Sequence, residues 1–202
     1  NLTGEIPPSL KNISQLEHIL LADNKLTGTI PNEFGKLPNL SILVLASNRL
    51  SGGIPETLYK YNQSSLRYLF LDSNMLGKTL PSNFGDTLLN LEQLTLKDNN
   101  FEGHLPASLG NISRLDWLDL SFNNFVGQVP TSFGNLGTLD YLNLQQNNLS
   151  GFIPIELGGL QINGARAFIG IGGNRPWELP RRNTGSAPMS YYLSDNRYAL
   201  CT

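Results

Sequence analysis

A nine-residue phrase, Leu-x-x-Leu-x-Leu-x-x-Asn, occurs six times in the 202-residue chain, with Ile replacing one Leu in the first copy. Its closing residues lie 24, 26, 25, 24 and 24 residues apart, and they are Asn24, Asn48, Asn74, Asn99, Asn123 and Asn147. This period predicts a solenoid, in which each coil buries its apolar side only against its neighbours. Because a solenoid offers a long concave surface rather than a closed pocket, the repeat favours a binding function.

Composition and charge argue against several other functions. The formal net charge of −2 gives no reason to expect a nucleic-acid partner, because phosphate neutralisation needs clustered Lys and Arg. No run approaches the ~18 apolar residues that span a bilayer, so a membrane would be reached only through segments absent from this chain. Cys201 is the one cysteine, so no internal disulfide can form.

Alternation inside each phrase predicts a short strand with one face in the core. In the fifth copy, Leu118 and Leu120 should point inward. Trp117, Asp119 and Ser121 should face outward on the concave side. The closing Asn of each phrase should lie buried in the following turn, where its amide can bond backbone groups of neighbouring coils. We therefore predict a ladder of asparagine side chains along the solenoid.

A second phrase follows each Asn, as in Leu26-Thr27-Gly28-Thr29-Ile30-Pro31. Its Gly permits a close backbone approach, and its Pro turns the chain onto the convex side. In the third repeat Gly77 comes one place early, and Lys78 takes the usual Gly position. The stretches between phrases, such as residues 107–112, have room for about one helical turn. They predict short 3₁₀ or helical segments on the convex face.

Together the two phrases resemble the plant-specific leucine-rich repeat, as in LDLSFNNFVGQVP over residues 118–130. The resemblance covers residues 1–160 and is to ectodomains of plant receptor-like kinases. It is strongest to the pattern-recognition group that includes rice bacterial-blight resistance receptors. It implies an α/β repeat solenoid: a right-handed superhelix with a parallel sheet on its concave face, a second strand beside it, and short 3₁₀ or helical convex segments.

The same resemblance implies a function. Ectodomains of this family bind a peptide or protein ligand and recruit a co-receptor ectodomain, for immune or developmental signalling through a kinase beyond one membrane span. The chain would then lie on the extracellular side of the plasma membrane. The family's paired-cysteine caps, membrane helix and kinase are missing from this sequence. We therefore expect an internal piece of a larger ectodomain or a truncated product.

Two alternatives to the receptor stay open. One is a secreted, apoplastic enzyme inhibitor, because the chain also resembles plant polygalacturonase inhibitors, which use a concave repeat surface but carry terminal cysteine pairs. The other is a non-functional receptor remnant. A membrane helix and kinase encoded downstream would favour the receptor, whereas a complete secreted chain with cysteine caps would favour the inhibitor.

Six Asn-x-Ser/Thr sequences would be glycan acceptors in a secreted protein, namely Asn1, Asn12, Asn39, Asn62, Asn111 and Asn148. Asn12 and Asn111 occupy equivalent convex positions and are the favoured acceptors. Asn39 lies just before a strand and Asn148 lies within the turn phrase, so both are candidates for steric blocking. Repeats rich in Asn, Leu and Ser also produce this tripeptide by chance.

Two columns of outward side chains should cross the concave sheet. The first is His18, Ile42, Tyr68, Gln93, Trp117 and Tyr141, and the second is Leu20, Val44, Phe70, Thr95, Asp119 and Asn143. Because strands lie about 4.8 Å apart, the columns should hold an apolar patch beside Leu20 and an aromatic pair bordered by acidic residues. Exposed patches of this kind tend to mark binding sites. We predict ligand contacts for Ile42, Val44, Tyr68, Phe70, Trp117, Asp119 and Tyr141; alternatively, these side chains only pack on one another across strands.

No catalytic, metal or cofactor site is predicted. His18 and His104 belong to different repeats and faces, and no His-Cys-carboxylate set has metal-ligand spacing. No serine lies in Gly-x-Ser-x-Gly, and Gly170-Ile171-Gly172-Gly173 lacks the Lys-Ser/Thr of a nucleotide loop. We therefore expect a chain without enzymatic activity.

Residues 161–202 contain no Leu-x-x-Leu-x-Leu phrase and carry five basic and two acidic side chains. Three interpretations compete: a disordered extension, a cap, or translation beyond a frameshift or lost splice junction. In the cap interpretation the exposed end would be covered by Phe168, Ile169, Trp177, Tyr191 and Tyr192. We favour a disordered or irregular tail after a solenoid over residues 1–160, and we assign no role to Cys201.

Overall fold

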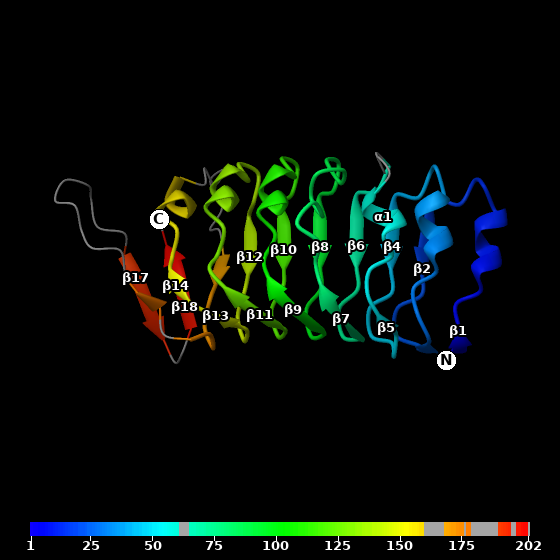
Figure 1. The fold of residues 1–202 in the computed structure, drawn as a ribbon, viewed down its shortest axis with the longest axis horizontal. Helices are drawn as coiled ribbons and strands as arrows, with labels where there is room; N and C mark the ends of the chain where they lie inside the picture. Colours follow the sequence, from blue (N-terminus) through cyan, green and yellow to red (C-terminus); the bar gives the residue numbers. More distant parts are fainter. Residues whose placement is uncertain (61–64, 160–167, 176, 179–189, 195–196, 202) are drawn as a thin grey trace.

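The computed structural model describes residues 1–60, 65–159, 168–175, 177–178, 190–194 and 197–201. Its coils stack into an elongated body, with a strand of the larger sheet on one side of each coil and a short helix or turn on another (Figure 1). This architecture confirms the predicted repeat solenoid with a parallel sheet.

Seven parallel strands form the larger sheet. In order they are β2 (His18–Leu20), β4 (Ile42–Val44), β6 (Tyr68–Phe70), β8 (Gln93–Thr95), β10 (Trp117–Asp119), β12 (Tyr141–Asn143) and β15 (Phe168–Gly170). The register does not slip, because each residue pairs with its counterpart in the next repeat, as Leu118 does with Leu142. The middle residue of every strand is buried, as the alternation predicts.

A second parallel sheet lies beside the first. It comprises β5 (Ser51–Gly52), β7 (Met75–Thr79), β9 (Asn100–His104), β11 (Asn124–Gly127) and β13 (Asn148–Leu149). The remaining described strands form three two-stranded sheets. They are β1 (Thr3–Glu5) with β3 (Lys25–Thr27), β14 (Gly151–Phe152) with β16 (Trp177–Glu178), and the antiparallel β17 (Ser190–Ser194) with β18 (Arg197–Cys201).

Short helical segments line the convex side. They are η1 (Pro8–Asn12), η2 (Asn32–Lys36), α1 (Thr57–Lys60), η3 (Ala107–Asn111), η4 (Thr131–Asn135) and η5 (Ile155–Gly159). Most follow the Pro of the second phrase: Pro31, Pro106 and Pro130 hold the extended conformation that precedes η2, η3 and η4. Their coils touch closely, since a Cβ on Gly110 would lie 2.3 Å from the Ser132 carbonyl oxygen.

Leucines and phenylalanines fill the space between the sheets and the convex segments. Phe34, Phe84, Phe101, Phe125 and Phe133 are fully buried, and each burial contributes roughly 1.5–3 kcal/mol. The rings of Phe101 and Phe125 stack in adjacent coils, with centroids 6.4 Å apart and planes at 3°.

The closing asparagines form the hydrogen-bonded ladder. Asn99 donates from Nδ2 to the carbonyl oxygens of Leu71, Leu96 and Lys97 at 2.9, 3.1 and 3.1 Å, and its Oδ1 accepts from the Leu76 N–H at 2.9 Å. Asn48, Asn74, Asn123 and Asn147 likewise each reach a carbonyl of the preceding coil. The residue before each Asn is left-handed, with φ between 52° and 55° at Asp23, Ser47, Ser73, Asp98, Phe122 and Gln146.

A seventh coil follows residue 160. Asn174 donates from Nδ2 to the carbonyl oxygens of Leu144 and Ile171, both at 2.8 Å, as the earlier ladder residues do. Ile169 and Ile171 are buried where earlier coils have Leu. The solenoid boundary predicted at residue 160 is therefore too early. The phrase is hidden because Arg166, Ile169 and Ile171 stand at its three Leu positions and because Asn174 comes 27 residues after Asn147.

The prediction of a disordered or irregular tail has a mixed outcome. Residues 168–175 belong to the seventh coil, and β16, β17 and β18 are strands. The side chains of Trp177, Tyr191 and Tyr192, and thus most of the cap interpretation, lie outside what the structure describes. So do the remaining residues of the tail and Asn62.

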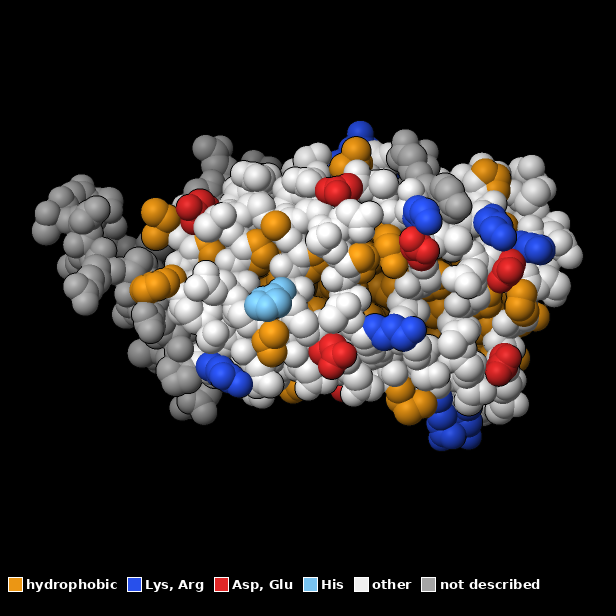
Figure 2. Space-filling view, in the orientation of Figure 1, with side chains coloured by type: hydrophobic (Ala, Val, Ile, Leu, Met, Phe, Trp, Pro, Cys, Tyr) orange, Lys and Arg blue, Asp and Glu red, His pale blue; other side chains and the backbone are white. Residues whose placement is uncertain are grey.

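One irregular repeat leaves a depression on the flank. It measures about 370 Å³, with Ile30, Ile54 and Leu80 among its lining residues, and Figure 2 shows hydrophobic side chains at its floor over β5 and β7. Gly53 contributes no side chain there, and Lys78 stands at the rim with a left-handed φ of 73°. Lys78 thus adopts the conformation that Gly has in the other repeats.

Candidate functional site

The concave face of the larger sheet carries the two predicted columns in the predicted order. Strand pairing sets Ile42 between His18 and Tyr68, and Gln93 between Tyr68 and Trp117. The columns therefore form a continuous surface in which each repeat contributes a different side chain.

The predicted apolar patch lies at the N-terminal end of this face. Ile42, Val44 and Phe70 are half-buried, and Leu20 is 64% exposed. The rings of Tyr68 and Phe70 meet edge to face, with centroids 6.3 Å apart. The patch is thus partly packed against itself and partly open to solvent.

A stack of three aromatic rings lies at the other end. Trp117 and Tyr141 are parallel with centroids 3.7 Å apart, and Phe168 stacks on Tyr141 at 4.8 Å. Trp117 remains 40% exposed. Sequence reasoning found the first two rings and missed Phe168 as part of this surface, because its strand was assigned to the tail.

Asp119 is not the open ligand contact that the sequence predicts. It is only 6% exposed, and its Oδ1 accepts from the N–H and the hydroxyl of Ser121 at 3.0 and 2.6 Å. Its Oδ2 accepts from Asn143 at 3.3 Å. Ser121, which was also expected to face out, is fully buried. The Asp119 carboxylate therefore stabilises the sheet, and little of it is accessible to a ligand.

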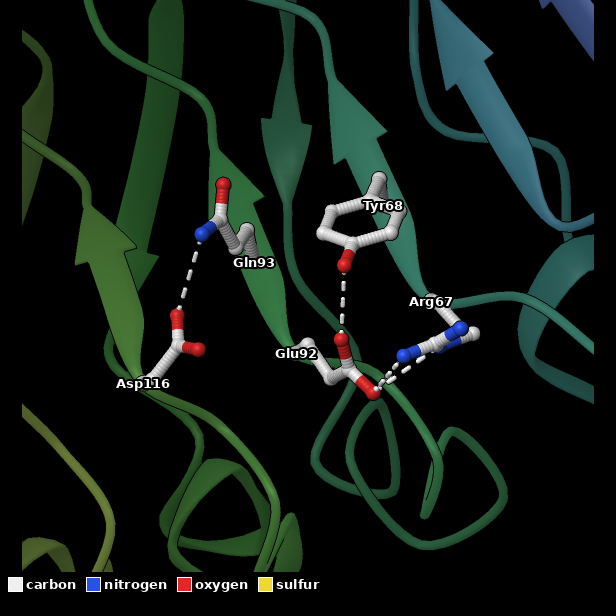
Figure 3. A network of polar contacts seen from close by, with 5 residues as sticks. All are labelled: Arg67, Tyr68, Glu92, Gln93 and Asp116. Atoms are coloured by element: carbon white, nitrogen blue, oxygen red, sulfur yellow. Dashed lines mark hydrogen bonds and ion pairs between the residues drawn. The ribbon is translucent and has the colours of Figure 1, made fainter.

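A polar network that the sequence did not indicate crosses the middle of the face (Figure 3). Glu92 accepts from Arg67 Nε at 2.8 Å and from the Tyr68 hydroxyl at 2.8 Å. The Arg67 guanidinium also pairs with Glu92 at 2.7 Å, and next to this group Gln93 donates to Asp116 at 3.2 Å. Arg67, Glu92 and Asp116 each precede a strand, which is a position where Glu and Asp recur. That recurrence is the sequence feature from which the network could have been predicted.

The pKa values of these carboxyl groups move in opposite directions. The hydrogen bond from the Tyr68 hydroxyl, with the Arg67 contacts, holds the pKa of Glu92 below its usual range. Burial raises the pKa of Asp116, the charges of Glu92 and Asp140 add to the rise, and the Gln93 bond opposes it. Burial likewise raises the pKa of Tyr141. Glu92 is therefore a satisfied carboxylate, whereas Asp116 is one that a cation would stabilise.

The described glycan acceptors Asn1, Asn12, Asn39, Asn111 and Asn148 are all exposed. Asn111 donates from Nδ2 to Asp86 at 2.9 Å, and Asn39 donates to the Ser14 carbonyl oxygen at 3.4 Å. Glycosylation of these residues stays a prediction.

Neither a metal centre nor a membrane segment emerges from the described part of the chain. Its His, Cys, Asp and Glu side chains include no group of three or more that could hold a metal ion. Among the same residues, no helix has the length and apolarity to cross a bilayer.

Comparison with protein families gives one match, to a model described as Leucine Rich Repeat. It matches residues 15–37, 39–61, 65–87, 90–112, 114–136 and 138–160. No sequence among the curated proteins matches this chain.

Solved structures give close likenesses. The plant peptide hormone receptor RGFR1 in complex with RGF2 is 37% identical with a TM-score of 0.79, over 89% of this chain and 27% of that chain. The Arabidopsis receptor kinase HAESA, in complex with the peptide hormone IDA and the co-receptor SERK1, is 32% identical with a TM-score of 0.77. The match covers 90% of this chain and 29% of that chain. A plant ice-binding protein is 31% identical with a TM-score of 0.74, over 86% and 54%. The chain thus spans less than a third of these two receptors.

Proposed function

The chain belongs to the leucine-rich-repeat family, and from this premise we propose that its concave face binds a peptide or protein ligand as part of a plant receptor-kinase ectodomain. The observation that carries the proposal is the row of unlike, partly exposed apolar and aromatic side chains on one rigid sheet, from Leu20 to Trp117. The similarity to complexes of plant receptors with peptide hormones supports it.

The proposal includes the location and partners of the chain. The chain would lie on the extracellular side of the plasma membrane. A co-receptor ectodomain would be its second partner, and binding would lead to immune or developmental signalling. The rice bacterial-blight resistance type is one form of such a receptor. The chain itself would have no enzymatic activity. A plant ice-binding protein has a similar fold, so the fold alone does not select the receptor; the varied concave row supports it.

Selection of short peptides from a random phage-displayed library on the chain tests this function. We expect the affinity of selected peptides to fall about tenfold or more in Trp117→Ala and in Tyr68→Ala, because aromatic side chains dominate binding hot spots. Phe152→Ala is the matched control, since Phe152 is an exposed aromatic residue of β14, away from the concave face. Peptides that bind all three variants as they bind the unmodified chain would contradict the proposal.

A further inference from the structure

The concave face has two chemically different halves. Strands β2, β4 and β6 present Leu20, Ile42, Val44 and Phe70, which are apolar. Strands β10 and β12 present the aromatic stack, and the residues that precede them are Asp116 and Asp140. A ligand that lies across the strands therefore meets an apolar surface at one end and an acidic, aromatic surface at the other.

The acidic charge of the second half is not neutralised within the described residues. Arg67 is held by Glu92 and so compensates that carboxylate alone. Lys97 has its Nζ 5.8 Å from the centre of the Phe122 ring, and the charge of Arg114 acts on Glu92, whose pKa it helps to lower. The Asp116 carboxylate accepts from the neutral Gln93, and within the described residues neither it nor the exposed Asp140 carboxylate has an ion pair. The raised pKa of Asp116 agrees with this unbalanced charge.

Besides the acidic charge, this half of the face offers the aromatic ring of Trp117. Tyr141 covers the ring face on the side of β12, and Phe168 continues the stack in the same direction. On the opposite side lies β8, whose residue in this column is Gln93, which holds Asp116. The other face of the Trp117 ring therefore looks toward β8, where Gln93 bonds Asp116, and Trp117 is 40% exposed. A cation bound there would meet the π-face of an indole and a negative charge together.

We propose that the concave face selects an extended peptide segment with an arginine side chain on Trp117 and Asp116 and an apolar side chain on the Ile42–Val44–Phe70 patch. The inference rests on the proposed function and names the class of ligand. Arginine suits the site better than lysine, because its planar guanidinium stacks on a ring and bonds a carboxylate with two N–H groups. Asp140 adds negative charge one strand away.

The sheet also sets the spacing between the two side chains. From β4 to β10 there are three strand intervals, or about 14 Å at about 4.8 Å each. An extended peptide rises about 3.3 Å per residue, so the apolar residue and the arginine should lie about four residues apart.

The test uses the peptides selected from the random library on the chain. We expect enrichment of arginine at this spacing from Leu, Ile, Val or Phe. Replacing that arginine by glutamine should weaken binding by roughly three- to tenfold, because partly exposed cation–π and ion-pair contacts are modest. In the Asp116→Asn/Asp140→Asn double variant, the same replacement should have little further effect. Glu102→Gln is the control for the loss of a carboxylate outside this face, because Glu102 is an exposed residue of the neighbouring sheet.

The outcomes separate this inference from the function on which it rests. Peptides that lose affinity in Trp117→Ala but show no arginine preference would overturn the cation site and leave the binding function standing. An arginine effect of equal size in the Asp116→Asn/Asp140→Asn variant would also overturn it. Selection of no peptide, or only of peptides indifferent to the concave variants, would overturn both.

Discussion

The interior ladder and the concave face of this solenoid follow opposite rules. The interior repeats one residue at one position, from Asn24 to Asn174, and each of these asparagines bonds the backbone around it. The concave face repeats only the position, which is filled in turn by His, Ile, Tyr, Gln, Trp, Tyr and Phe. The first region satisfies buried backbone groups, which are the same in every coil, and the second would meet the proposed partner, which is not periodic. Stability and recognition should therefore be separable by mutation.

The largest effect should come from breaking the ladder. Asn99→Leu leaves the Leu76 N–H without its acceptor. It also removes one of the two side-chain donors to the carbonyl oxygens of Leu71 and Leu96, which keep Asn74 and Asn123. An unsatisfied buried group costs roughly 1–3 kcal/mol and each lost hydrogen bond about 0.5–1.5 kcal/mol, so we expect a loss of about 3–5 kcal/mol, measured by urea denaturation. Asn100→Leu changes the next, exposed residue and should cost far less. Equal denaturation midpoints for the two variants would show that the ladder contributes no more to stability than an exposed asparagine does.

The next effect concerns the contact between coils on the convex side. Gly110→Ala places a Cβ 2.3 Å from the Ser132 carbonyl oxygen, so one coil must move. Overpacking of this kind costs about 1–3 kcal/mol, and the free energy of unfolding should fall by that amount. Gly137→Ala is the control, since no atom lies within 4 Å of its added Cβ. A Gly110→Ala variant as stable as Gly137→Ala would show that the coils are not closely packed there.

A smaller effect, of opposite sign, is expected where the repeat is irregular. Lys78 has φ 73°, and a left-handed residue with a side chain costs roughly 1–2 kcal/mol. Glycine recovers most of this but loses roughly 0.5–1 kcal/mol of backbone entropy, so Lys78→Gly should stabilise the chain by up to about 1 kcal/mol. Thr79→Gly, one residue along β7, should instead destabilise it. Urea denaturation midpoints of the two variants test this prediction. A Lys78→Gly variant that is no more stable than Thr79→Gly would contradict it.

The smallest effect distinguishes two carboxylates of the concave face. Because the fold lowers the pKa of Glu92, its charged form stabilises the native state, and Glu92→Gln should be less stable than the unmodified chain at neutral pH. This deficit should disappear as the pH falls from neutral through the lowered pKa of Glu92.

Asp116 should respond in the opposite way. Because burial raises its pKa, the charged form is disfavoured in the folded state, and Asp116→Asn should be slightly more stable at neutral pH. That gain should shrink as the pH falls through the raised pKa of Asp116, and it should vanish well below the ordinary Asp pKa of about 3.9, where the carboxyl is protonated in folded and unfolded chains alike. Denaturation midpoints of both variants across this pH range test the contrast, and shifts of the same sign would contradict it.

The sequence predicts the parts of this molecule that depend on local pattern. Alternation and period place Leu118 in the core, order the concave columns and identify Asn99, because each depends on residues a few places apart. Asp119 is different, since its burial and its bonds to Ser121 and Asn143 depend on packing that alternation does not encode. Phe168 was missed because Ile169 and Ile171 fill the core of a coil in which the pattern requires Leu.

The unbroken register of the larger sheet bears on how such a surface can change between related genes. Since every residue pairs with its counterpart one coil away, duplication or loss of a whole coil preserves each contact within the coils that remain. One coil gained between β4 and β10 would move the apolar and acidic halves apart by about 4.8 Å. If the concave face binds an extended peptide as proposed, recombination that adds or removes whole repeats would change the spacing of its two halves in steps of one coil. It would thereby change the length of the peptide that fits, without a point mutation.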